Sequence, residues 1–173
     1  MKIKKISYTA IMIAIGVLLP QVFHLIGGSA SGGTFLPMHI PVLLSGMLLG
    51  PLSGTLTGII CPVLSFLITG MPPVAKLSFM VFELLAYGFI SGIASKKLKL
   101  NCYISLIISM IGGRIVNAFA LWVSMLLFNM NVSPLMAVWS ALLNGITGLI
   151  IQLVFIPLLY KLLSRMVNIN DRN

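Results

Sequence analysis

The stretch from Leu36 to Pro73, LPMHIPVLLSGMLLGPLSGTLTGIICPVLSFLITGMPP, decides the fold of this chain. It holds two apolar segments, His39–Leu49 and Gly54–Thr69, and both are shorter than the roughly 20 residues that usually cross the hydrocarbon layer of a membrane. The sequence GPLSG between them interrupts the helical pattern with glycine and proline. We therefore predict a hairpin of two short membrane helices that neighbouring helices partly shield from lipid.

The composition of the whole chain is that of a membrane protein. Of its 173 residues, 59% are hydrophobic and 8% are charged, whereas charged residues make up about a quarter of an ordinary soluble domain. We expect an all-α membrane protein in which residues 1–173 form a single transmembrane domain. The six predicted transmembrane helices cover about residues 6–26, 39–49, 54–69, 77–95, 103–128 and 134–160.

The net charge of +9 comes from lysine and arginine residues that lie mostly at the ends of the predicted helices. This distribution differs from the basic, aromatic-studded face of a nucleic-acid-binding protein, so we expect no nucleic-acid partner. Lysine and arginine are enriched in cytoplasmic loops, which predicts that both termini are cytoplasmic and that Lys76 lies outside. The basic residues expected at the cytoplasmic side, near anionic lipid, are Lys2, Lys4, Lys5, Lys96, Lys97, Lys99, Lys161, Arg165 and Arg172.

Two ionisable residues lie deep inside the predicted helices. Glu83 occurs in KLSFMVFELLAYGFISG and Arg114 in SLIISMIGGRIVNAFALW. A charged side chain at the centre of a bilayer costs roughly 2.5–3.5 kcal/mol on insertion scales, so it usually faces the protein interior and marks a function. The planar guanidinium of Arg114 matches a carboxylate, which makes it the stronger candidate for binding a ligand.

Other polar residues share helix faces with this pair. Positions three or four residues apart lie on one side of a helix, and the rise of about 1.5 Å per residue places these groups in the outer half of the membrane. We predict that the three faces, on the last three helices, line one pocket. They comprise Glu83, Tyr87 and Ser91; Arg114, Asn117 and Leu121; and Ser140, Asn144, Thr147 and Gly148.

His39 and Trp139 are further candidates, each with a second interpretation. His39 lies between two prolines that constrain the backbone and could aim its ring inward. A histidine at the membrane interface can equally be solvated and bind no ligand. Trp139 could stack on a planar ligand or belong to the aromatic belt of the membrane interface. Similarly, Glu83 and Arg114 could bind a ligand or form a buried ion pair that fixes helix packing.

No metal site or cofactor is predicted. Cys61 and Cys102 are isolated in the sequence, without the paired spacing of zinc or redox motifs, and we expect both to pack as small apolar side chains. The two histidines do not complete a set of three metal ligands.

The chain resembles the substrate-binding S component of energy-coupling factor (ECF) vitamin transporters. The likeness extends over its length and includes the short basic N-terminus, the AIMIA motif of Ala10 and Ala14, and the hairpin from Leu36 to Pro73. The helices containing MVFELLAYGFISG and GGRIVNAFALW are similar to the same group.

The resemblance implies a non-enzymatic subunit in the cell membrane of a prokaryote. Such a subunit binds a vitamin or precursor such as niacin, pantothenate or folate, and works with a transmembrane coupling protein and two ATP-binding cassette ATPases. Ala10 and Ala14 would face the coupling protein, and the segment Gly27–Pro37 would form a loop that closes over the vitamin. A buried arginine beside amides favours a ligand with a carboxylate, such as niacin or pantothenate.

Two other classes of protein are alternatives to this interpretation. A self-sufficient ion-coupled carrier would normally show broken helices, related halves or an acidic relay. An intramembrane protease would use Ser45 and a histidine, but Ser45 and His39 are six residues apart on different faces of one predicted helix, separated by about 9 Å along its axis.

Overall fold

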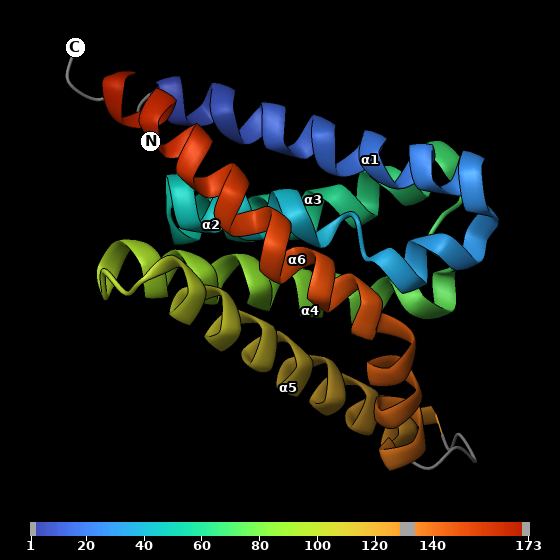
Figure 1. Ribbon diagram of the computed structural model, residues 1–173. Helices are drawn as coiled ribbons and strands as arrows, with labels where there is room; N and C mark the ends of the chain where they lie inside the picture. Colours follow the sequence, from blue (N-terminus) through green and yellow to red (C-terminus); the bar gives the residue numbers. More distant parts are fainter. Residues whose placement is uncertain (1–2, 129–133, 171–173) are drawn as a thin grey trace.

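The computed structural model describes the backbone of residues 3–128 and 134–170, which is almost entirely helical (Figure 1). Within those helices, side chains 28–33, 75, 124–128, 134–138, 140–142, 144 and 166–170 are outside the description. The elements are α1 Ile3–Phe35, α2 His39–Leu49, α3 Pro51–Thr69, α4 Val74–Gly92, the π-helix η1 Ile93–Lys97, α5 Cys102–Phe128 and α6 Pro134–Asn170.

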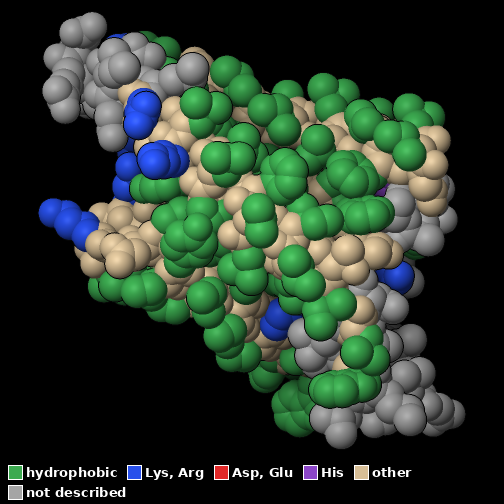
Figure 2. Space-filling view, in the orientation of Figure 1, with side chains coloured by type: hydrophobic (Ala, Val, Ile, Leu, Met, Phe, Trp, Pro, Cys, Tyr) green, Lys and Arg blue, Asp and Glu red, His purple; other side chains and the backbone are tan. Residues whose placement is uncertain are grey.

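Five of these helices contain segments that are long and apolar enough to cross a membrane, and α2 is a shorter apolar helix. The prediction of an all-helical membrane bundle is therefore confirmed. Figure 2 shows hydrophobic side chains over most of the visible face, while most of its lysine and arginine side chains gather at the end where Figure 1 places the N-terminus. Such a surface fits lipid contact along the helices and a charged rim at one end. The sixth crossing and the cytoplasmic location of the termini stay predictions.

The predicted α2–α3 hairpin turns at a single residue, Gly50. Its φ of +102° is in the range that favours glycine, and its amide donates to the carbonyl of Gly46 at 2.9 Å. The turn is shorter than predicted, because α3 already begins at Pro51 instead of Gly54. Proline suits the first turn of a helix, where its missing amide hydrogen is not needed.

The prediction that α1 ends at Ile26 and is followed by a loop from Gly27 to Pro37 is wrong. The helix continues to Phe35 and leaves only residues 36–38 as a connection to α2. Phe23 and Phe35 would be about 18 Å apart along a straight helix, yet their ring centroids are 5.4 Å apart. The helix therefore bends back on itself, as Figure 1 shows.

Tertiary packing explains why the glycine-rich end of α1 stays helical. A Cβ atom added at Gly148 of α6 would lie 2.8 Å from the carbonyl oxygen of Thr34 and 2.9 Å from that of Phe35. The two backbones are thus in direct contact, which offsets the low helix propensity of the segment.

The other helix boundaries differ from the predictions at their ends. α4 begins at Val74 instead of Leu77, and η1 carries the helical run to Lys97 instead of Ser95. α5 begins one residue early, at Cys102. α6 runs to Asn170 instead of Tyr160, because the sequence from Lys161 to Asn170 contains no glycine or proline to end it.

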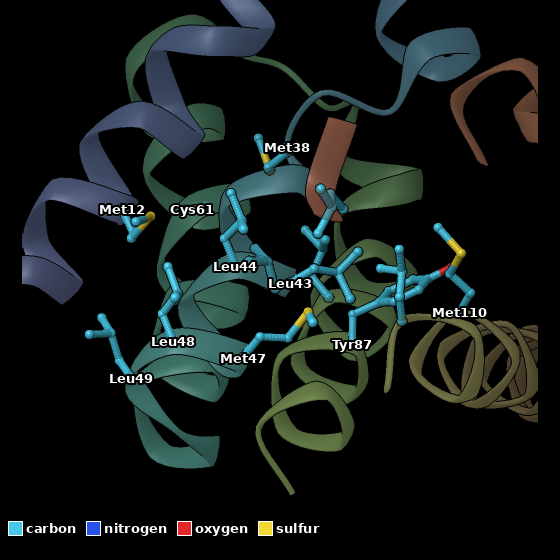
Figure 3. Close-up of a cluster of buried hydrophobic side chains, with 14 residues drawn as sticks. Met12, Met38, Leu43, Leu44, Met47, Leu48, Leu49, Cys61, Tyr87 and Met110 are labelled. Carbon is cyan, nitrogen blue, oxygen red and sulfur yellow. The ribbon is translucent and has the colours of Figure 1, made fainter. Parts of the chain in front are cut away.

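A tightly packed unit of α2, α3 and α4 forms the centre of the molecule. The backbones of α3 and α4 touch at Gly54 and Gly88, where a Cβ on either residue would collide with the carbonyl oxygen of the other. Small residues allow this close approach between membrane helices. In Figure 3 the side chains of α2, among them Leu43 and Met47, occupy the middle of the buried cluster, with Met12 of α1 on one side and Met110 of α5 on the other.

The Gly54–Gly88 contact predicts a specific sensitivity to a single methyl group. Gly88→Ala should lower the free energy of unfolding by about 2–3 kcal/mol, because the rigid backbone of α3 cannot make room. The measurement is unfolding of the detergent-solubilised protein followed by circular dichroism.

Gly112→Ala provides the matched control. Its Cβ would meet the end of the Ile90 side chain, which can move, and alanine is a better helix former than glycine. We expect a loss below about 1 kcal/mol. Equal losses in the two variants would contradict the interpretation of a close backbone contact.

Candidate functional site

Glu83 of α4 and Arg114 of α5 form an ion pair inside the bundle. Arg114 Nη1 lies 3.1 Å from Glu83 Oε1, and the side chains are 16% and 7% exposed. The sequence left open whether the two residues lie close enough to pair, and the structure shows that they do. Each charge is thereby compensated where the membrane would otherwise make it costly.

Asn117 engages the second oxygen of the same carboxylate. Its Nδ2 donates a hydrogen bond to Glu83 Oε2. Asn117 follows Arg114 by three residues, so both side chains leave the same face of α5. Both polar residues of this face of α5 therefore contact Glu83: Asn117 hydrogen-bonds Oε2, and Arg114 forms its ion pair with Oε1.

His39 and Tyr87 also lie close to Glu83. His39 Nε2 is 3.8 Å from Glu83 Oε1, and the His39 ring meets the Tyr87 ring edge to face, with centroids 5.0 Å apart. Tyr87 is one turn after Glu83 on α4. The backbone turn before α2 fixes His39, whose amide donates to the carbonyl oxygen of Leu36 at 3.1 Å.

Five of the predicted site residues thus form one buried assembly, which we call the polar cluster. It draws on α2 as well as on α4 and α5, whereas the sequence placed the pocket between the last three helices. The members of the polar cluster are His39, Glu83, Tyr87, Arg114 and Asn117.

α6 reaches the polar cluster through residues that the sequence analysis missed. A Cβ at Gly145 would lie 2.8 Å from Arg114 Nη2, so the absence of a side chain there makes room for the guanidinium. Gln152 is fully buried, and its Nε2 donates to the Leu36 carbonyl oxygen at 3.4 Å. Gln152 lies eight residues after Asn144 and four after Gly148, so it shares their face of α6. This spacing could have identified Gln152 from the sequence.

Several hydrogen-bonding groups of the polar cluster have no hydrogen-bond partner among the described atoms. They are both ring nitrogens of His39, Glu83 Oε1, the Tyr87 hydroxyl, and Nε and Nη2 of Arg114. Buried polar groups are nearly always hydrogen-bonded. A concentration of such groups in one place is what a site for a small polar molecule requires.

The remaining predicted site residues lie on α6. Ser140 and Asn144 belong to this helix, but their side chains lie outside the described residues. The Trp139 side chain is 64% exposed, as expected for an aromatic belt at the membrane interface. No contact between Trp139 and the polar cluster is found in the described part of the chain, and its role in stacking stays a prediction.

The two alanines predicted to face a partner lie on the surface of α1. Ala10 and Ala14 are both exposed, and their spacing of four residues places them on one side of the helix. Another helix could approach closely at this stripe because the side chains are small.

The serine considered for an intramembrane protease has a packing role. Ser45 Oγ is buried and hydrogen-bonded to Thr57 Oγ1 at 2.9 Å, which assigns its hydroxyl to the packing of α2 against α3. Among the described residues, no group of three histidine, cysteine or acidic side chains could hold a metal ion.

One comparison with known proteins gives a match. The model of a family described as "ECF transporter, substrate-specific component" matches residues 4–160. No match is found among curated proteins or among solved structures.

Breaking the ion pair should cost more stability than replacing both of its residues. Glu83→Ala leaves the Arg114 charge buried without its partner, which should lower the free energy of unfolding by about 3–5 kcal/mol. Replacing both residues by methionine removes the charges together and should cost less than Glu83→Ala alone. The measurement is unfolding of the two variants in the same detergent. A greater loss in the double variant would contradict the view that the Glu83 carboxylate compensates Arg114.

Proposed function

The chain belongs to the family of substrate-specific components of ECF transporters, and we propose that it binds a vitamin or vitamin precursor for such a transporter. Members of this family are transport subunits and not enzymes. The protein contributes a multi-pass membrane domain and the recognition of a small molecule.

The observation that carries the proposal is the group of unused hydrogen-bond donors and acceptors in the polar cluster. The scaffold is rigid at this point, because α4 packs against α3 through backbone contact at Gly88. Donors held by rigid helices bind a small molecule with little loss of conformational entropy. The polar cluster is therefore our candidate for the substrate site.

Arg114 favours a substrate with a carboxylate. Its Nη1 is used by Glu83, whereas Nε and Nη2 have no hydrogen-bond partner among the described atoms. These two nitrogens form the side edge of the guanidinium, whose parallel N–H groups match the two oxygens of a carboxylate. Niacin and pantothenate carry such a group, and so does folate.

We also propose which proteins this chain works with and in which membrane. ATP hydrolysis would take place on two separate ATP-binding cassette ATPases, because the sequence has no phosphate-binding loop of the G-x-x-x-x-G-K-[ST] type. A transmembrane coupling protein would contact Ala10 and Ala14 on the exposed side of α1. We place the complex in the plasma membrane of a prokaryote, with both termini of this chain in the cytoplasm.

Mass spectrometry of the small molecules that co-purify with the detergent-solubilised protein tests the proposed site. The unaltered protein should retain a vitamin-like compound. Arg114→Ala should lower the affinity for that compound at least tenfold, equal to about 1.4 kcal/mol, while the protein still inserts into the membrane. The same substitution at Arg165, far along α6, should leave binding unchanged. Full retention by Arg114→Ala would remove this residue from the site.

Substitutions at Ala10 and Ala14 should block transport without affecting substrate binding. Ala10→Trp and Ala14→Trp should abolish co-purification with the coupling protein and uptake into cells, because bulk prevents close helix approach. Substrate binding by the isolated subunit should persist. Ile150→Trp, at an exposed position of α6, is the matched control and should allow assembly. Transport by the purified chain alone in liposomes would instead favour a self-sufficient carrier.

A further inference from the structure

The two oppositely charged residues of the polar cluster, Glu83 and Arg114, balance each other before any substrate is considered. Arg114 contributes one positive charge and Glu83 one negative charge, and the two are in contact. Asn117, which occupies the other oxygen of Glu83, is neutral. An anion bound at the free edge of Arg114 would therefore bring an excess negative charge into the bundle.

An excess charge is costly inside a membrane protein, where water does not screen it. Two solutions preserve neutrality. Either the substrate is itself neutral, or a positive charge enters the polar cluster together with an anionic substrate. The second requires a residue that can gain a proton beside the site.

His39 is positioned to gain that proton. The residue is 2% exposed, and its Nε2 lies 3.8 Å from the carboxylate oxygen of Glu83 that also meets Arg114. Both ring nitrogens are buried without a hydrogen-bond partner among the described atoms. Histidine is the side chain whose charge ordinarily changes between pH 5 and 8.

The helices around α2 bring few other ionisable groups to this position. α4 contributes Glu83 and Tyr87, and α5 contributes Arg114. On α1, Gly16 is level with Pro41, so Tyr8 and His24 are each eight residues away, or about 12 Å along a straight axis.

The ionisable side chains of the other neighbours lie elsewhere. Cys61 of α3 donates to the carbonyl oxygen of Ile13, on α1. α6 carries Lys161 nine residues after Gln152, about 14 Å along the axis. η1 packs at the far end of α2, where Ser95 Oγ donates to the carbonyl oxygen of Met47, and it carries Lys96 and Lys97.

We infer that the polar cluster binds a monoanionic carboxylate together with one proton, and that His39 holds the proton. The inference rests on the proposed function and specifies the charge of its substrate. In this step one hydronium proton from solvent is bound by a ring nitrogen of His39, and no other covalent bond forms or breaks. The substrate stays a carboxylate on Arg114, and the total charge of the polar cluster with its ligand is zero.

Calorimetric titration of the full chain in detergent tests this inference. The titrants are two acids, nicotinate and pantothenate, and their neutral counterparts, nicotinamide and pantothenol. Each titration is run in phosphate and in Tris, whose ionisation enthalpies differ, so that the difference in binding heat counts protons. An acid that binds should take up about one proton, and its dissociation constant should rise about tenfold per pH unit over the range in which that uptake is measured.

Titrations of two histidine variants test which residue binds the proton. His39→Gln should abolish the proton uptake and weaken the binding of the acid at least tenfold. His24→Gln, the matched control on α1, should leave the proton uptake unchanged. Persistence of the uptake in His39→Gln would show that the proton lies elsewhere, on the substrate for example, and would overturn the inference.

Failure of the inference can be told from failure of the proposed function. Binding of an acid without proton uptake, or failure of both acids to bind, overturns the inference. The proposed function survives either result if a vitamin-like compound still co-purifies with the protein. It fails if none co-purifies and none of the four titrants binds.

Discussion

The carboxylate of Glu83 joins three helices, since its two oxygens face Arg114 and Asn117 of α5 and His39 of α2. A carboxylate in the middle of a membrane bundle must be compensated, and this demand restricts how α2, α4 and α5 can pack. Tyr87 and Gly145 fit around the same pair, the first through its ring contact with His39 and the second through the space it leaves for the guanidinium.

Backbone packing holds this arrangement in place. α3 and α4 touch at Gly54 and Gly88, and the helix carrying Glu83 and Tyr87 is fixed by that contact. Membrane helices gain little from the hydrophobic effect on associating with one another, so close contact between small residues supplies much of the attraction. The polar cluster thus rests on helices whose backbones are in direct contact.

The two interpretations of Glu83 and Arg114 as a structural pair and as a binding site are compatible. One edge of the guanidinium is committed to Glu83, and the other is free of hydrogen bonds among the described atoms. An arginine can serve both roles because its donors lie in a fixed plane and point in different directions. This division of donors connects the fold of the protein with the proposed recognition of a carboxylate.

The sequence by itself determined the helical membrane class, the α2–α3 hairpin and most of the polar cluster, because apolar length, glycine–proline breaks and residue spacing along a helix are local properties. It misjudged the segment Gly27–Phe35, where glycine and serine predict a loop but contact with Gly148 of α6 supports a helix. Only the tertiary structure decided that Glu83 and Arg114 pair, that His39 joins them from α2, that Gly145 lies against Arg114, and that Gln152 bonds the turn before His39. These facts depend on the rotation and depth of helices distant in the sequence, which are set by how whole helices pack together.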